Sequence, residues 1–321
     1  MSHVLSLAVA NLLTPMVLFF ALGLLAGRLK SDLSIPEAVS KGMSLYLMLA
    51  IGFRGGVELS HGAISGSVVA ALLLAVLISF SLPWLACTLL RIVTKLPLTD
   101  RAAIAAHYGS VSVVTFVTAT ALLVQREVSY EPYLVAMMAL METPAIVSGL
   151  LLARGGSQRL SKELMHEVFL SGSIVLLLGS FGIGWLTGGA GQAAIAPFVD
   201  QPFKGILCLF LLDMGLLTAR RLPKLSETGA MLIAFGVVMP LIGASIGLIA
   251  ATVLGLSVGG TCLMAVLAGS ASYIVVPAAM RTAIPEANPA LYVGLSLGVT
   301  FPFNLLVGIP LYYAIAAWIA G

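Results

Sequence analysis

The sequence predicts an all-α integral membrane protein with about ten transmembrane helices, and three observations support this fold class. The 321 residues are 60% hydrophobic and only 9% charged, so they offer too little polar surface to enclose a soluble core of this size. Long apolar runs alternate with short polar clusters, and roughly 20 apolar residues cross a bilayer core of about 30 Å. Motifs in the two halves of the chain also recur at a nearly constant spacing, which indicates two repeats.

The first half contains five apolar runs whose ends carry residues typical of helix boundaries. Pro36 precedes the second run, Pro97 and Asp100 precede the fourth, and Pro132 begins the fifth. The predicted spans of this first five-helix repeat, residues 1–153, are 12–28, 38–58, 64–90, 101–124 and 132–153.

The second half begins after the longest polar stretch, residues 154–167, and also contains five apolar runs. The segment Ile284-Pro-Glu-Ala-Asn-Pro289 separates the last two. The predicted spans of this second five-helix repeat, residues 168–321, are 168–188, 203–220, 228–255, 259–283 and 290–319.

Orientation follows from the positions of Lys and Arg, because short loops rich in these residues stay in the cytoplasm. If both termini face outward, the 16 basic residues all lie on the cytoplasmic side except Arg54, Arg126 and Lys204. This distribution places the loop 154–167 in the cytoplasm.

Three pairs of segments relate the two halves. Gly55 aligns with Gly215 and Gly109 with Gly269, both at an offset of 160 residues, and Glu142-Thr-Pro144 falls near Thr300-Phe-Pro302. Each repeat has an odd number of spans, so the second enters the membrane from the opposite side. The sequence therefore predicts two inverted five-helix repeats.

The motif Gly-Ser-x-Ser interrupts the fourth and ninth predicted spans. Gly and Ser form helix less readily than the surrounding Ala and Leu, so each span should break there and expose the N-terminus of a half-helix. Such an end binds anions, and freed carbonyl groups beside it can hold Na⁺. The candidate anion-binding residues are Gly109, Ser110, Val111 and Ser112 in the first motif, and Gly269, Ser270, Ala271, Ser272 and the following Tyr273 in the second.

The alternative interpretation of each motif is close packing of two membrane helices through small residues. Recurrence of the motif at the symmetry-related position favours a binding site.

Acidic residues inside apolar runs are informative because a buried charge is unfavourable in a bilayer. Glu142 lies well inside its span, where it could balance a coupling cation, move a proton, or form a structural hydrogen bond. Asp213 is equally deep, and we expect it to pair with Arg54. The candidate Na⁺ ligands are Ser110, Glu142, Thr143, Ser270, Thr300 and Asn304. His107, two residues before the first motif, either makes transport sensitive to pH or packs structurally.

Two other classes of protein are disfavoured. The net charge of +3 is scattered among loops without a basic stripe, so we expect no nucleic acid as a partner. No GxSxG, HExxH or GxGxxG motif is present, so we expect neither an enzyme nor an organic cofactor.

Long strings of residues resemble the sodium-dependent bicarbonate permease family of cyanobacteria and other bacteria. They include Ser31 to Lys41, Tyr46 to Leu59, Ala105 to Thr115 and Ala268 to Pro277. The resemblance covers nearly the whole chain.

The resemblance implies Na⁺-coupled bicarbonate uptake across a bacterial inner membrane by a homotrimer embedded in lipid. It also implies an elevator-like motion in which spans 3–5 and 8–10 form a moving core and spans 1, 2, 6 and 7 form a scaffold. The family's site at two broken helices corresponds to the two motifs described above. A trimeric PII-like regulator docks on the cytoplasmic face of cyanobacterial members, and the loop 154–167 is short for that role.

Physical reasoning alone leaves other functions open. A Na⁺- or H⁺-coupled transporter of another small anion fits the same residues, and so does a membrane sensor that binds an anion without transporting it. A channel is disfavoured, because no ring of charges or filter-like repeat is visible.

Overall fold

The computed structural model describes residues 13–60, 65–154, 172–226 and 229–320, and every regular element in these ranges is a helix. The predicted cytoplasmic loop 154–167 lies outside the described residues after Arg154. The elements of the first half are α2 (Pro15–Arg28), α3 (Glu37–Ser60), α4 (Gly66–Val93), α5 (Leu98–Gly109), α6 (Val113–Gln125), α7 (Leu134–Leu140) and α8 (Glu142–Ala153). Those of the second half are α10 (Gly172–Val199), α11 (Phe203–Ser226), α12 (Ala230–Leu254), α13 (Val258–Gly269), α14 (Val275–Ala283), α15 (Pro289–Leu295), η1 (Ser296–Thr300), α16 (Phe301–Phe303), η2 (Asn304–Gly308) and α17 (Ile309–Ala320).

Several of these segments are long and apolar enough to cross a membrane. Five stretches of the described chain meet both criteria: Gly66–Val93, Leu98–Gln125, Leu134–Ala153, Ala230–Leu254 and Pro289–Ala320. A sixth candidate is the pair α10 and α11, which are bent by 49° at a short break. The chain is thus a helical, multi-pass membrane protein, and the count of ten spans stays a prediction.

Local sequence explains where many helices begin and end. Thr14 accepts a hydrogen bond from the backbone N–H of Val17 and precedes Pro15, a favourable first residue of a helix. Asn288 caps α15 in the same way, again directly before a proline. Gly255 ends α12 with φ of 65°, a left-handed conformation that glycine adopts without strain.

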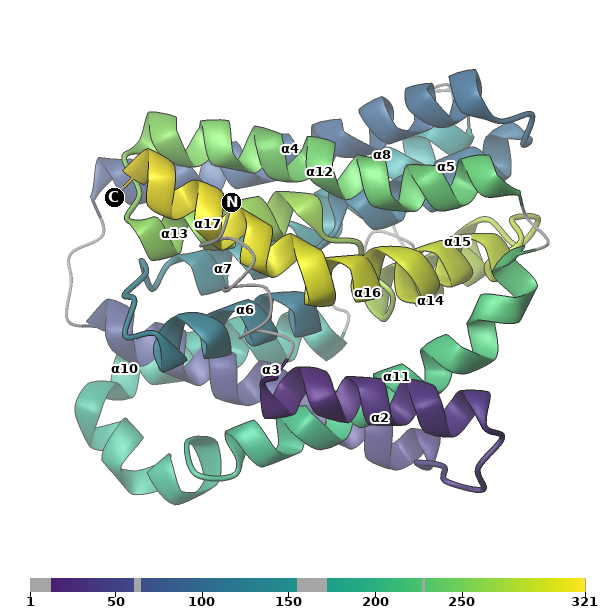
Figure 1. The fold of residues 1–321 in the computed structure, drawn as a ribbon. Coiled ribbons are helices and arrows are strands. Elements are labelled where there is room, and N and C mark those ends of the chain that lie inside the picture. The colour runs from purple at the N-terminus through teal and green to yellow at the C-terminus, as the bar shows by residue number, and fades with distance from the viewer. Residues whose placement is uncertain (1–12, 61–64, 155–171, 227–228, 321) are drawn as a thin grey trace.

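Four helices, α2, α3, α10 and α11, pack together as a layer on one side of the molecule (Figure 1). We call them the four-helix layer. Glycines bring their backbones into contact: a methyl group on Gly23 would overlap the carbonyl oxygen of Leu212, and one on Gly56 would overlap that of Phe181. Contacts of this kind are typical of tightly packed membrane helices.

The remaining helices, α4–α8 and α12–α17, form a larger body above this layer (Figure 1). Here α4 packs on α5 and α8, and α12 packs on α13. Glycines again set the closest approaches, because added methyl groups on Gly243 and Gly109 would meet Ala268 and Pro83. The larger body touches the layer mainly through α7 against α3 and α10, and through α15 and η1 against α11.

The predicted end of the sixth span at Gly188 coincides with a kink, because Gly188 has non-helical backbone angles, with φ of 55° and ψ of −149°. A second helical segment follows this kink and ends at Val199. It places Asp200 beside α3, where its Oδ1 lies 2.6 Å from Arg54 Nε, and this makes one prediction wrong. Arg54 therefore pairs with Asp200 rather than Asp213, whose carboxylate accepts a 2.5 Å hydrogen bond from Ser40.

Candidate functional site

Both Gly-Ser-x-Ser motifs lie where a helix ends. Helix α5 ends at Gly109 and α6 begins at Val113, while α13 ends at Gly269 and α14 begins at Val275. Ser110 and Ser270, the residues that follow the two glycines, are both extended, with φ and ψ of −95° and 158° and of −100° and 172°. The two motifs thus have the same local conformation.

Hydrogen bonds join the two non-helical segments across the two halves of the chain. The backbone N–H of Ser112 donates to Ser270 Oγ at 3.0 Å. The backbone N–H of Ser272 donates to the carbonyl oxygen of His107 at 2.9 Å. These reciprocal bonds bring residues from the two halves of the chain to one place, and all four are buried.

The two half-helices that start here differ at their N-termini. Ser112 Oγ caps α6 by accepting hydrogen bonds from Thr115, at 3.2 Å from the backbone N–H and 2.8 Å from Oγ1. Helix α14 starts after Ile274, which supplies no side-chain cap. The N–H groups of the first turn of α14 are therefore the freer donors for an anion.

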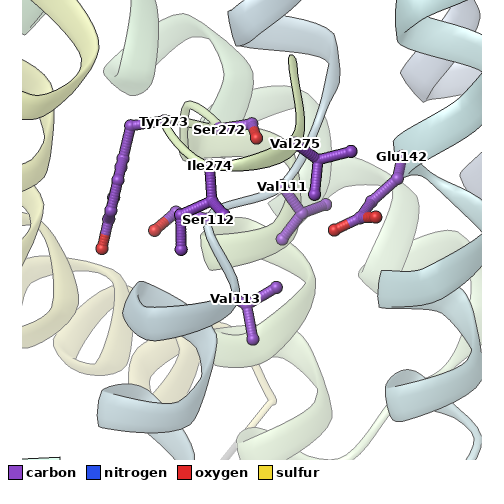
Figure 2. A pocket seen from close by; sticks show the side chains of 8 residues that line it. All are labelled: Val111, Ser112, Val113, Glu142, Ser272, Tyr273, Ile274 and Val275. Atoms are coloured by element: carbon purple, nitrogen blue, oxygen red, sulfur yellow. The ribbon is translucent and has the colours of Figure 1, made fainter. Parts of the chain in front are cut away.

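A small cavity lies between these segments (Figure 2). Its volume is about 10 Å³, close to the smallest space that holds a single water molecule. The lining residues are Val111, Ser112, Val113, Glu142, Ser272, Tyr273, Ile274 and Val275. An anion larger than water needs this cavity to widen before it can bind.

Glu142 reaches this cavity from the first turn of α8, on the side opposite Tyr273 (Figure 2). It is only 1% exposed, and neither carboxylate oxygen has a hydrogen-bond partner among the described residues. An isolated buried carboxylate is strongly unfavourable unless a proton or cation neutralises it. Glu142 is therefore a candidate either to hold a proton or to bind a cation.

The other predicted Na⁺ ligands lie around the site without lining the small cavity. Asn304 donates through Nδ2 to the carbonyl oxygen of Gly269 at 2.8 Å, and its Oδ1 accepts from the hydroxyl of Tyr312 at 2.9 Å. Thr300 donates to the carbonyl oxygen of Gly236 at 2.7 Å. These two side chains stabilise the surroundings of the second motif in this conformation.

Of the predicted site residues, the structure brings Val111, Ser112, Glu142, Ser272 and Tyr273 to the cavity. The other predicted site residues do not line it: Gly109, Ser110, Thr143, Gly269, Ser270, Ala271, Thr300 and Asn304. Ser110 Oγ is buried and has no hydrogen-bond partner among the described residues.

Three lining residues escaped sequence analysis: Val113, Ile274 and Val275. All are apolar, so no chemical property marked them. Their only signal was position, because each is the last residue before a half-helix or the first residue in one.

A second cavity of about 440 Å³ lies between the four-helix layer and the larger body. Lys41 and Ser40 of α3, Phe210 of α11 and Arg281 of α14 are among its lining residues. It shares Tyr273 and Ile274 with the small cavity. The two cavities therefore adjoin at these two residues.

A sequence model of the Na⁺-dependent bicarbonate transporter superfamily matches residues 15–317. No curated protein matches the chain. Because the match covers all but the ends of the chain, this protein belongs to the Na⁺-dependent bicarbonate transporter superfamily.

Proposed function

We propose that this protein is a secondary transporter that carries bicarbonate into the cell together with Na⁺. The observation that carries the proposal is the pair of hydrogen-bonded Gly-Ser-x-Ser segments, which line a small cavity together with Glu142. The carboxylate of Glu142 has no hydrogen-bond partner in the described part of the chain. Membership of the superfamily names the substrate and the ion. The arrangement of hydrogen-bond donors and acceptors supports a separate binding position for the anion and for Na⁺.

The anion is expected to bind at the N-terminus of α14. The uncapped N–H groups there and the hydroxyl groups of Ser272 and Ser112 supply hydrogen-bond donors, and the helix dipole adds positive potential. The donors come from both repeats, so a bound anion would hold the two repeats together.

Na⁺ is expected to bind beside Glu142. Its unpartnered carboxylate favours a cation, and carbonyl or hydroxyl oxygens of the neighbouring non-helical segments can complete the coordination. Ser110, Thr143, Ser270, Thr300 and Asn304 stay predicted ligands, and Thr300 and Asn304 would first exchange their present hydrogen bonds. Binding of one ion would lower the electrostatic penalty for binding the other.

The topology supports alternating access between inverted repeats. The four-helix layer corresponds to the predicted scaffold (spans 1, 2, 6 and 7), and the larger body to the predicted core. Several glycines bring backbones into contact within each part, and the boundary between the two parts holds the large cavity. We infer that the core slides against the scaffold as a unit.

The large cavity supports an inward-facing arrangement. Lys41 and Arg281 line it, and both belong to the set of basic residues that the positive-inside rule places in the cytoplasm. This orientation puts both termini outside a bacterial inner membrane. A homotrimer and a PII-like cytoplasmic regulator remain proposals that rest on the resemblance.

Uptake of radiolabelled bicarbonate by proteoliposomes tests the proposal. An inward Na⁺ gradient should drive accumulation, and replacing Na⁺ with choline should abolish it. A protonophore should leave the Na⁺-driven component in place. Uptake that ignores the Na⁺ gradient would exclude the coupling, and binding without uptake would favour the anion-sensor alternative.

A further inference from the structure

Two residues separate the small cavity from the large one. Tyr273 and Ile274 are the lining residues that the two cavities share. Tyr273 is 9% exposed, whereas Ile274 is 37% exposed, and both lie in the non-helical segment before α14. An ion that moves directly from one cavity to the other would pass these side chains.

The ring of Tyr273 is the inner end of an aromatic stack that crosses between the two parts of the molecule. It packs edge-on against Phe301 of α16, with ring centroids 5.2 Å apart at 65°. Phe301 packs edge-on against Phe20 of α2, with centroids 5.6 Å apart at 77°. Both geometries are favourable for aromatic rings. The stack therefore links the site to the four-helix layer.

The middle ring of this stack occupies an unusual place in the chain. Phe301 lies between two π-helical turns, η1 and η2. Such turns are rare and cluster at functional sites, because they disturb the regular hydrogen-bond ladder of a helix. Phe301 and Phe20 are each only 1% exposed, so neither ring is free to move unless its neighbours move.

We propose that Tyr273 is the gate between the two cavities, and that the stack Phe20–Phe301–Tyr273 couples this gate to the position of the larger body on the four-helix layer. In the present arrangement Phe20 supports Phe301, which holds the Tyr273 ring in place and keeps the small cavity closed. Displacement of the body separates Phe301 from Phe20 and releases the gate. This inference rests on the proposed function, since it assumes that the body moves.

Chemical labelling of a cysteine in the small cavity measures the state of the gate without transport. Val113 lines that cavity and is 6% exposed, so Val113→Cys is the reporter (Figure 2). It is introduced after Cys87, Cys208 and Cys262, the three native cysteines, are replaced by serine. The probe is a small, cationic, membrane-impermeant methanethiosulfonate, applied to vesicles of each orientation.

We expect slow labelling of the reporter alone. Tyr273→Ala should speed labelling at least tenfold, and Phe20→Ala at least threefold. The increase should occur only from the face that carries Lys41 and Arg281, where the large cavity opens. Phe20→Leu keeps much of the side-chain volume and should give a smaller increase, which serves as the measurement if Phe20→Ala does not fold.

A matched pair of rings provides the control. Tyr108 and Phe235 pack edge-on with centroids 5.1 Å apart at 80°, and both lie inside the larger body. Phe235→Ala removes a similar contact without touching the stack, so the labelling rate should change by less than 1.5-fold. Thermal unfolding of each variant checks that a general loosening is not responsible.

The coupling is overturned if Phe20 variants label no faster than Phe235→Ala. The gate itself is overturned if Tyr273→Ala leaves labelling slow. Labelling needs neither bicarbonate nor Na⁺, so these outcomes are independent of the uptake assay. Failure of uptake by the wild-type protein would instead count against the proposed function.

Discussion

The two Gly-Ser-x-Ser segments match in sequence and backbone conformation but differ in their hydrogen bonds. In the first, Ser112 caps α6, so one backbone N–H group of that half-helix's first turn, that of Thr115, is already satisfied. In the second, the N-terminus of α14 lacks a side-chain cap, and Asn304 instead satisfies the carbonyl oxygen of Gly269 at the end of α13. Equivalent motifs have thus acquired different partners.

This difference supports a division of roles between the two halves of the chain. The N-terminus of α14, the proposed anion site, belongs to the second half, whereas Glu142, the proposed cation site, belongs to the first. A symmetric pair of breaks would bind two similar ions. An asymmetric pair can bind two ions of opposite charge side by side, as coupling requires.

The largest expected effect comes from a change at Glu142, the proposed cation-binding residue. Glu142→Gln removes the buried charge, and we expect Na⁺-driven uptake to fall at least tenfold, because interactions with charged groups contribute about 1.5–3 kcal/mol. The apparent Na⁺ affinity should fall more than the bicarbonate affinity, as measured by uptake at varied concentrations of each ion. Glu286→Gln, at an exposed loop position, is the control and should transport normally. A normal Na⁺ dependence in Glu142→Gln would contradict the division of roles.

Removal of the Ser270 hydroxyl and removal of the Ser110 hydroxyl should affect uptake to different extents in the same experiment. Ser270→Ala leaves the buried N–H of Ser112 without its acceptor, which costs about 1–3 kcal/mol. We expect bicarbonate affinity to fall roughly tenfold or more. Ser110→Ala removes a hydroxyl without a partner among the described residues, so its effect should be weaker.

Both serine variants should assemble like the wild-type protein, which size-exclusion chromatography checks. Normal uptake by both variants would indicate that the motifs serve helix packing and not anion binding.

The thermal stability of the protein should depend on the hydrogen bond from Asn304 to the carbonyl oxygen of Gly269. Asn304→Leu removes the donor to Gly269 and the acceptor for Tyr312, leaving buried polar groups unsatisfied at about 1–3 kcal/mol each. We expect the midpoint of thermal unfolding in detergent to fall by several degrees. An unchanged midpoint would show that water replaces both hydrogen bonds.

The smallest effect is expected at the cap of α6. Thr115→Val removes the 2.8 Å hydrogen bond from Oγ1 but keeps the one from the backbone N–H. The loss should be about 0.5–1.5 kcal/mol, so transport should fall less than in Ser270→Ala. If instead it matched Ser270→Ala, the two segments would contribute equally and the comparison would fail.

Much of the fold class was accessible from sequence because membrane spans depend on composition. The helical, multi-pass character followed from hydropathy, and the family followed from long strings of residues. Both motifs lie where helices end, because glycine and serine do not extend a helix as alanine and leucine do.

Tertiary contacts were less accessible. The expected pairing of Arg54 with Asp213 failed because it ignored the residues after Gly188. The helix breaks at Gly188 as predicted, but a second helical segment follows to Val199, and Asp200 reaches Arg54 as a result. Likewise, no local pattern indicated that Asn304 would satisfy Gly269, because that bond depends on how α17 and its π-helical turns pack against α13.

The kink at Gly188 also bears on how deeply the protein sits in its membrane. A straight helix of 28 residues extends about 42 Å, well beyond a hydrocarbon thickness of about 30 Å. Gly188, with φ of 55°, lets the chain change direction partway along α10 without steric strain. The part beyond it exposes Phe198, whose ring is suited to the interface between lipid headgroups and acyl chains. One glycine thereby divides a helix that would be too long for the hydrocarbon core if straight into two shorter segments that point in different directions.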